Sequence, residues 1–267
     1  FDDDLYVGGS FSNVVGLPQV IGLSNIGRYE NAASCNSNCW SAVHSGFNST
    51  VYALEKGILG NQAGDILYIG GEFTALNGSM LVAKRFTAYR PIDGAMLEFP
   101  GLNGTVKALA YIPSTFSIYA GGSFTQNDDN NLELNRIAYY PGGVDWRALP
   151  ENGLNGDVNA LVRSENLVFV GGDFTQTQAA TPTALSRVAS YDSTPDQQTW
   201  TPFASGLNDS VLAMGIDNIG NPPFKLLIAG GRFTRNGANL GEYLKRLVSF
   251  EFFAGAPQVA AKDAVLG

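Results

Sequence analysis

A short pattern that recurs five times is the feature that most constrains how this chain can fold. Each copy consists of three apolar residues, the second usually aromatic, followed by Gly-Gly, one variable residue and Phe. The copies occupy residues 5–11, 67–73, 118–124, 168–174 and 227–233. They lie about 50 to 60 residues apart, and a fixed period of this size indicates a repeat protein.

Other elements keep the same period. A Gly-(Leu/Phe)-Asn turn and a Val-x-Ala-(Leu/Met) strand precede the last four copies, at residues 46–54, 101–109, 153–161 and 206–214. A further apolar strand follows the copies, for example at residues 136–140, 187–191 and 246–250. A last element is marked by an aromatic residue: Trp40, Phe99, Trp146 or Trp200. We find no convincing amphipathic helix, and the four elements of each unit predict four short strands.

Four-stranded units repeated at this period are typical of propeller blades, so we predict an all-β fold, a β-propeller of about five four-stranded antiparallel blades. The strands of a blade should follow one another in chain order. We assign one domain, residues 1–267, with blades at roughly 1–47, 48–102, 103–154, 155–207 and 208–257.

The first unit lacks the Val-x-Ala-Leu strand. Val265 lies where the next repeat would place its valine, so residues 258–267 are a candidate to close the first blade. The alternative is that a further blade of a longer protein starts there. Phe1 in place of a methionine indicates a processed chain or an excised piece.

Composition narrows the function classes. The chain is 45% hydrophobic and 15% charged, which favours a globular fold, and its net charge of −8 gives no basic footprint for nucleic acid. No apolar run reaches the roughly 18 residues of a membrane helix. We therefore expect neither a nucleic-acid partner nor a membrane span in this chain.

The two cysteines, Cys35 and Cys39, are separated by three residues, and His44 is the chain's single histidine. These residues cannot supply the four ligands of a zinc site. A local disulfide in an oxidising compartment is the favoured interpretation, and two free surface thiols are the alternative.

Together these motifs resemble the kelch-like propeller repeat of fungal cortical cell-polarity marker proteins and of secreted bacterial and algal surface proteins. The resemblance covers nearly the whole chain. It implies an extracellular or cell-surface glycoprotein that acts in surface organisation or adhesion. It brings no catalytic residue and no cofactor, and other surface or matrix proteins or a polysaccharide would be the partners.

Four sequons are candidate N-glycosylation sites: Asn48, Asn77, Asn103 and Asn208. The alternative is that asparagine simply suits a tight turn. Asn155 keeps the same turn without a sequon, which supports this alternative.

The variable residue of the Gly-Gly-x-Phe pattern is the candidate for facing a ligand or partner, in the five copies Ser10, Glu72, Ser123, Asp173 and Arg232. Simple solvent exposure is the alternative. A second recurring set is Arg85, Arg136, Arg187 and Arg246, with Asn25 in the matching place. Structural bonds to backbone carbonyls are favoured over a ring of ligand-binding arginines.

Acidic clusters at residues 2–4 and 127–131 do not match a calcium loop, so we predict no metal site. A five-bladed glycosidase would need paired carboxylates facing one cavity, and no such set stands out. We therefore expect a non-enzymatic structural or interaction propeller of a cell-surface, cell-wall or matrix assembly. A lectin-like, carbohydrate-binding propeller is the alternative, and a glycosidase a more distant one.

Overall fold

The computed structural model describes residues 4–13, 22–30, 39–60, 64–79, 82–143, 145–218, 224–237, 244–253 and 259–264. This part of the chain is all-β, as predicted: it forms nineteen strands in five antiparallel sheets. One short 3₁₀ turn, η1 (Pro150–Asn152), is its helical element. Within these ranges, no helix has the length and apolarity needed to span a membrane.

Four sheets have four strands each. The second contains β4 (Val51–Gly57), β5 (Ile66–Gly71), β6 (Phe86–Arg90) and β7 (Ala95–Leu97). The third contains β8 (Val106–Ile112), β9 (Ser117–Gly122), β10 (Ile137–Tyr140) and β11 (Arg147–Ala148). The fourth contains β12 (Val158–Ser164), β13 (Leu167–Gly172), β14 (Val188–Asp192) and β15 (Trp200–Pro202). The fifth contains β16 (Val211–Asp217), β17 (Phe224–Gly231), β18 (Leu247–Phe253) and β19 (Val259–Ala264).

Within each sheet the strands are paired in chain order, which confirms the predicted succession of elements. The first sheet has three described strands, β1 (Leu5–Gly8), β2 (Ile26–Tyr29) and β3 (Trp40–Ala42). The aromatic residue does not always open the outer strand. Phe99 follows β7 rather than starting it, because that strand ends at Leu97.

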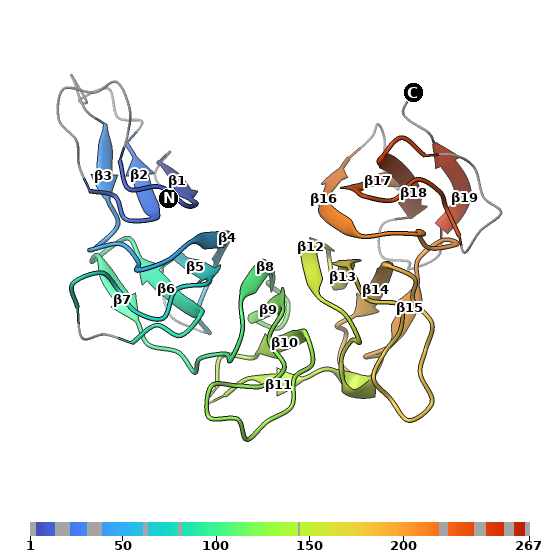
Figure 1. The fold of residues 1–267 in the computed structure, drawn as a ribbon, viewed down its shortest axis with the longest axis horizontal. Helices are drawn as coiled ribbons and strands as arrows, with labels where there is room; N and C mark the ends of the chain where they lie inside the picture. The colour runs from blue at the N-terminus through green and yellow to red at the C-terminus, as the bar shows by residue number, and fades with distance from the viewer. Residues whose placement is uncertain are drawn as a thin grey trace.

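The five sheets lie side by side along an open arc, with β4, β8, β12 and β16 toward its middle (Figure 1). Consecutive inner strands contact one another. The first and last sheets stand at the two ends of the arc. The predicted closure of the first blade by residues 258–267 is therefore wrong for β19.

β19 instead pairs with β18, through Ser249 with Ala264 and Phe252 with Val259. The predicted fifth unit, residues 208–257, is correspondingly too short. A physical reason is that the outer edge of β18 would otherwise present unpaired backbone groups, and β19 is the strand that follows it in the sequence. Residues 265–267, with Val265, lie outside the described part.

The glycine pair explains how closely the sheets pack. A Cβ atom on Gly70, Gly121 or Gly171 would lie less than 3.0 Å from the valine that opens the next inner strand. A Cβ on the second glycine, for example Gly122, would meet the Thr105 carbonyl just as closely. Only glycine fits here, so the repeat spacing reflects sheet-to-sheet contact.

Aromatic side chains fill the space between sheets. The phenylalanine after the glycine pair is fully buried at Phe73, Phe124, Phe174 and Phe233. Trp146 packs edge-on against Phe86 of the preceding sheet, with ring centroids 4.9 Å apart, and its indole N–H donates to the Pro100 carbonyl at 2.8 Å. Each sheet thus depends on its neighbours for its core.

Candidate functional site

Each inner strand of the four full sheets begins with a β-bulge. Pairing with the glycine strand shifts register between Val51 and Ala53, and at the equivalent place in β8, β12 and β16. A bulge leaves one residue out of the ladder and redirects its side chain. The bulge residues of the four strands are Tyr52, Lys107, Asn159 and Leu212.

The bulge lies opposite the glycine pair, directly beside the variable residue that follows it. Side chains of both kinds line one pocket of about 600 Å³ that spans the second to fifth sheets. Its lining residues are Tyr52, Glu72, Thr105, Lys107, Ser123, Asp157, Asn159 and Leu212. Residues at positions that vary between the repeats therefore lie together in this pocket.

Asp157 is the centre of the charged part of the pocket. Lys107 Nζ lies 2.9 Å from Asp157 Oδ2 and donates to Asn159 Oδ1 at 3.0 Å. Arg136 Nη1 lies 3.0 Å from Asp157 Oδ1. Because these side chains are about a quarter to a third exposed, each pair contributes at most about 1 kcal/mol, and their main effect is to hold Lys107 in place.

Asp173 extends this network toward the fifth sheet. Asn159 Nδ2 donates to Asp173 Oδ2 at 3.2 Å and to the Val211 carbonyl at 3.0 Å. The Ser210 hydroxyl donates to Asp173 Oδ1. One run of polar contacts thus links the third, fourth and fifth sheets.

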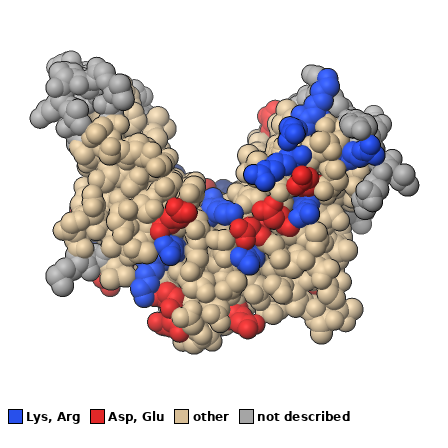
Figure 2. All heavy atoms as spheres, in the orientation of Figure 1, with Lys and Arg blue, Asp and Glu red and all other residues tan. Residues whose placement is uncertain are grey.

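The rim of the pocket offers apolar surface and a carboxylate. Tyr52 is 51% exposed and Leu212 48% exposed. Glu72 is exposed, and no described residue forms an ion pair with its carboxylate. Figure 2 shows Lys and Arg alternating with Asp and Glu over the inner strands of this face. An aromatic ring beside fixed polar groups suits an amphipathic ligand such as a peptide or a sugar.

The structure brings some of the predicted residues together but not all. Glu72 and Ser123 line this pocket, and Asp173 is bonded to a residue that does. Ser10 lines a different pocket, and Arg232 lies on the exposed rim of the fifth sheet. The prediction missed the bulge residues, although the variable x of Val-x-Ala was a signal for them.

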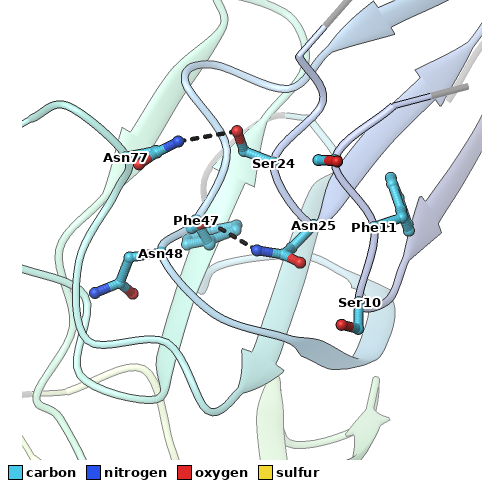
Figure 3. A pocket seen from close by; sticks show the side chains of 8 residues that line it. Ser10, Phe11, Ser24, Asn25, Phe47, Asn48 and Asn77 are labelled. Atoms are coloured by element: carbon cyan, nitrogen blue, oxygen red, sulfur yellow. Dashed lines mark hydrogen bonds between the residues drawn. The ribbon is translucent and has the colours of Figure 1, made fainter.

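The second pocket, of about 420 Å³, lies between the first and second sheets (Figure 3). Its polar lining comes from Ser10, Ser12, Ser24, Asn25, Asn48 and Asn77. Asn77 Nδ2 donates to Ser24 Oγ at 2.9 Å, and Asn25 Nδ2 donates to the Phe47 carbonyl at 2.9 Å. Its amide and hydroxyl groups therefore largely join the two sheets.

The asparagine of the Gly-Leu-Asn turn has a structural role in every full unit. In the fourth sheet, Asn155 Oδ1 accepts from the backbone N–H groups of Thr175 at 2.8 Å and Gln176 at 3.1 Å. Asn155 Nδ2 donates to Thr175 Oγ1 at 2.8 Å. The same set of three bonds is made by Asn48, Asn103 and Asn208.

These contacts explain the asparagine without a glycan, as its presence at the non-sequon Asn155 also indicates. Asn48, Asn77, Asn103 and Asn208 are all exposed. A sugar on Asn48, Asn103 or Asn208 would have to be attached to an amide nitrogen already bonded to a threonine. Glycosylation at the four sequons stays a prediction.

The recurring arginine is also structural. Arg136 adopts a left-handed φ of 73°, and its guanidinium donates to the Ser123 carbonyl at 2.6 Å. Arg85 and Arg187 make the same bond to the carbonyls of Glu72 and Asp173. These bonds favour the predicted role over a ring of ligand-binding arginines, although Arg136 also contacts Asp157 in the pocket.

The remaining candidates fall mostly into turns. Asn127 Oδ1 accepts from the backbone of Asn131 and Leu132, and Asp128 pairs with Lys84 at 2.5 Å. No group of three or more His, Cys, Asp or Glu side chains in the described ranges could hold a metal ion. Cys35, Asp2 and Asp3 lie outside the described residues, so the disulfide between Cys35 and Cys39 stays a prediction.

Glu55 is a partly buried acid that the motifs did not single out. Burial raises the pKa of its carboxyl, opposed by the Tyr111 backbone N–H, which donates to Oε1 at 3.1 Å, and by the charge of Arg163. The equivalent residues in the other full sheets are Ala110, Val162 and Gly215. A charge where other repeats have small or apolar residues was the available signal.

Comparison with known proteins gives a limited result. No model of a protein family matches the chain. Polarized growth protein L1 of Phoma sp. is 31% identical over 120 residues, which cover 44% of this chain and 8% of that protein. Polarized growth protein rax2 of Schizosaccharomyces pombe is 31% identical over 157 residues, which cover 56% of this chain and 13% of that protein.

The chain thus spans only a small fraction of the length of these curated relatives. Among solved structures, U3-55K aligns with 75% of this chain and 48% of its own at a TM-score of 0.42 and 10% identity. The RRP9 WD40 repeats align with 78% and 62%, also at 0.42 and 10%. By sequence, this chain has distant relatives among fungal polarized growth proteins.

Proposed function

We propose that this chain is a non-enzymatic interaction module of a cell-surface, cell-wall or matrix assembly, built on a kelch-like propeller and located outside the cell. The observation that carries the proposal is the pocket at the bulges. Its lining residues occupy the positions that differ between repeats, while the surrounding glycine, asparagine and arginine contacts are the same in each unit. The distant relatives named for polarized growth are in keeping with a surface role.

The lining chemistry favours recognition of another macromolecule. Lys107 is held in place by Asp157, so its ammonium group can orient a partner's polar group. Tyr52 and Leu212 add exposed apolar area, the kind of surface that contributes most when a partner covers it. A protein partner with a short apolar segment flanked by polar groups fits this combination.

The test is a retention experiment with fungal cell-wall and surface proteins passed over the immobilised chain. We expect a defined set of proteins to be retained, and a Tyr52→Ser, Leu212→Ser double variant to lose them. Val82→Ser is the matched control, because Val82 is 57% exposed and does not line the pocket. Equal retention by the double variant would reject the pocket as the interaction site.

Carbohydrate binding is the second candidate. The exposed ring of Tyr52 beside Asn159, Ser123 and Glu72 resembles the pairing of an aromatic face with hydrogen-bonding groups that sugars use. A glycan array separates the two candidates. Strong binding that free sugar inhibits and Tyr52→Ser abolishes would favour the lectin, whereas a blank array with protein retention would favour the first proposal.

A further inference from the structure

In its described residues, the face of the fifth sheet that points away from the fourth sheet is less buried than the equivalent faces of the other full sheets. In the second to fourth sheets, the first residue of the third strand packs against the following sheet. Phe86, Ile137 and Val188 occupy this place in the second to fourth sheets and are 0% exposed. The equivalent Leu247 of β18 is 39% exposed.

The glycine strand of the fifth sheet shows the same difference. Every residue of β5, β9 and β13 is buried. In β17, Leu226 and Ile228 are only partly buried, although the equivalents of Ile228 are Tyr68, Tyr119 and Phe169, at 3% exposure or less. Leu226, Ile228, Gly230 and Leu247 together define what we call the terminal face.

Gly230 carries the most specific information. Its equivalents Gly8, Gly70, Gly121 and Gly171 each receive the valine that opens the next inner strand, so tightly that a Cβ atom could not be accommodated. At Gly230 a Cβ would meet nothing closer than 3.8 Å, the Arg246 carbonyl oxygen. The terminal face therefore has the same glycine that contacts a valine at each of the four sheet-to-sheet interfaces, but no described valine contacts Gly230.

We propose that the terminal face docks a further unit of this same repeat, through a Val-x-Ala-(Leu/Met) strand whose valine seats on Gly230. The interface would continue the four already present, in which the same glycine, the same valine and the same bulge recur. This inference does not depend on the function proposed for the pocket.

A second copy of this chain cannot supply that strand from its folded surface. Val51, Val106, Val158 and Val211 are each 2% exposed or less and are already seated on glycines of their own molecule. In both fungal relatives, by contrast, the matched region is a small part of the protein, so additional chain is available in proteins of this kind. An additional unit is thus the occupant that the face fits.

The test uses an extended chain that carries a second copy of residues 203–264 directly after Ala264. Leu247→Cys places a thiol on the terminal face, and its rate of reaction with a thiol reagent is measured above the background of the unsubstituted protein. We expect this rate to be at least about tenfold lower in the extended chain, because a buried thiol reacts only when the interface opens. Val82→Cys, exposed in both proteins, should react at one rate throughout.

Gly230→Val makes the test specific. In the original chain the added side chain has room, so thermal stability should hardly change, whereas Gly171→Val, which clashes with Val211, should lower it clearly. In the extended chain Gly230→Val should restore fast labelling at Leu247→Cys. Equal labelling in both chains, or protection in the original chain through dimers, would overturn the proposal.

Discussion

The third and fourth sheets and the first sheet contain the same pattern in different surroundings. All residues of β9 and β13 are buried, whereas none of the four residues of β1 is, and Leu5 is 57% exposed. β9 and β13 each have an inner strand at one edge and a sheet on both faces. Among the described strands, β1 pairs with β2 and packs against β4 of the second sheet. The pattern determines the conformation, and neighbouring units determine the burial.

The largest effect should come from the phenylalanine after the glycine pair. Phe124→Ala in the third sheet should lower the free energy of unfolding by about 3–5 kcal/mol, because the ring is fully buried and leaves a cavity. Phe11→Ala should cost only about 1–2 kcal/mol, because that ring is half-buried and lines an open pocket. Urea unfolding followed by tryptophan fluorescence measures both. Similar losses would mean that the first sheet is as tightly packed as the middle ones.

The turn asparagines should show a smaller difference in the same direction. Asn155→Ala should cost about 1–3 kcal/mol, because two backbone N–H groups and a threonine hydroxyl lose their partner. Asn77→Ala loses one exposed bond to Ser24 and should cost less than about 0.5 kcal/mol. The absence of a sequon at Asn155 removes any confusion with a glycan. Equal effects would contradict the structural role of the Gly-Leu-Asn turn.

For ion pairs, we expect the opposite difference: a larger loss of stability in the first sheet than in the middle sheets. The Asp4 side chain is 9% exposed and pairs with Arg28 at 2.6 Å, whereas Asp157 is 27% exposed. Asp4→Asn should therefore cost about 1–2 kcal/mol and Asp157→Asn about 0.5–1 kcal/mol. The loss at Asp157 should shrink more in 1 M NaCl, since exposed pairs are screened more strongly. A larger loss at Asp157 would show that its two cations act cooperatively.

The repeats made the order of the strands and the recurring contacts between sheets predictable from the sequence. Glycine pairs, phenylalanines and Gly-Leu-Asn turns recur because each serves one contact between sheets, such as Val158 on Gly121. The succession of strands and the structural role of the arginines could therefore be predicted from the sequence.

The rest depended on pairing between distant segments. The bulges in β4 and β8 direct Tyr52 and Lys107 toward one pocket. Each bulge depends on how the inner strand pairs with its glycine strand, and the sequence of one strand does not specify that register. The prediction assigns residues 258–267 to the first blade because Val265 fits the valine spacing of the repeat. In the structure β19 pairs with β18, whose outer edge would otherwise be unpaired. The low burial of Leu247 depends on a neighbouring unit, and burial of that kind is not encoded locally.

The smallest effects should appear in the pH dependence of stability, where burial by neighbours again decides the sign. Burial raises the pKa of Glu55, so its carboxylate form opposes folding at neutral pH, and this cost disappears as the pH falls through the raised pKa. Glu55→Gln should therefore be slightly more stable than the parent at pH 7, and the advantage should vanish in acid.

Asp209 is exposed, and the Ser210 backbone N–H lowers the pKa of its carboxyl. Its carboxylate form therefore favours folding at neutral pH, and this effect is lost as the pH falls through the lowered pKa. Asp209→Asn should be slightly less stable than the parent at pH 7 and should approach it in acid. Thermal melts of the three proteins between pH 3 and pH 8 compare the two signs, and a Glu55→Gln protein that is destabilised at pH 7 would show that the Tyr111 hydrogen bond outweighs the cost of burial.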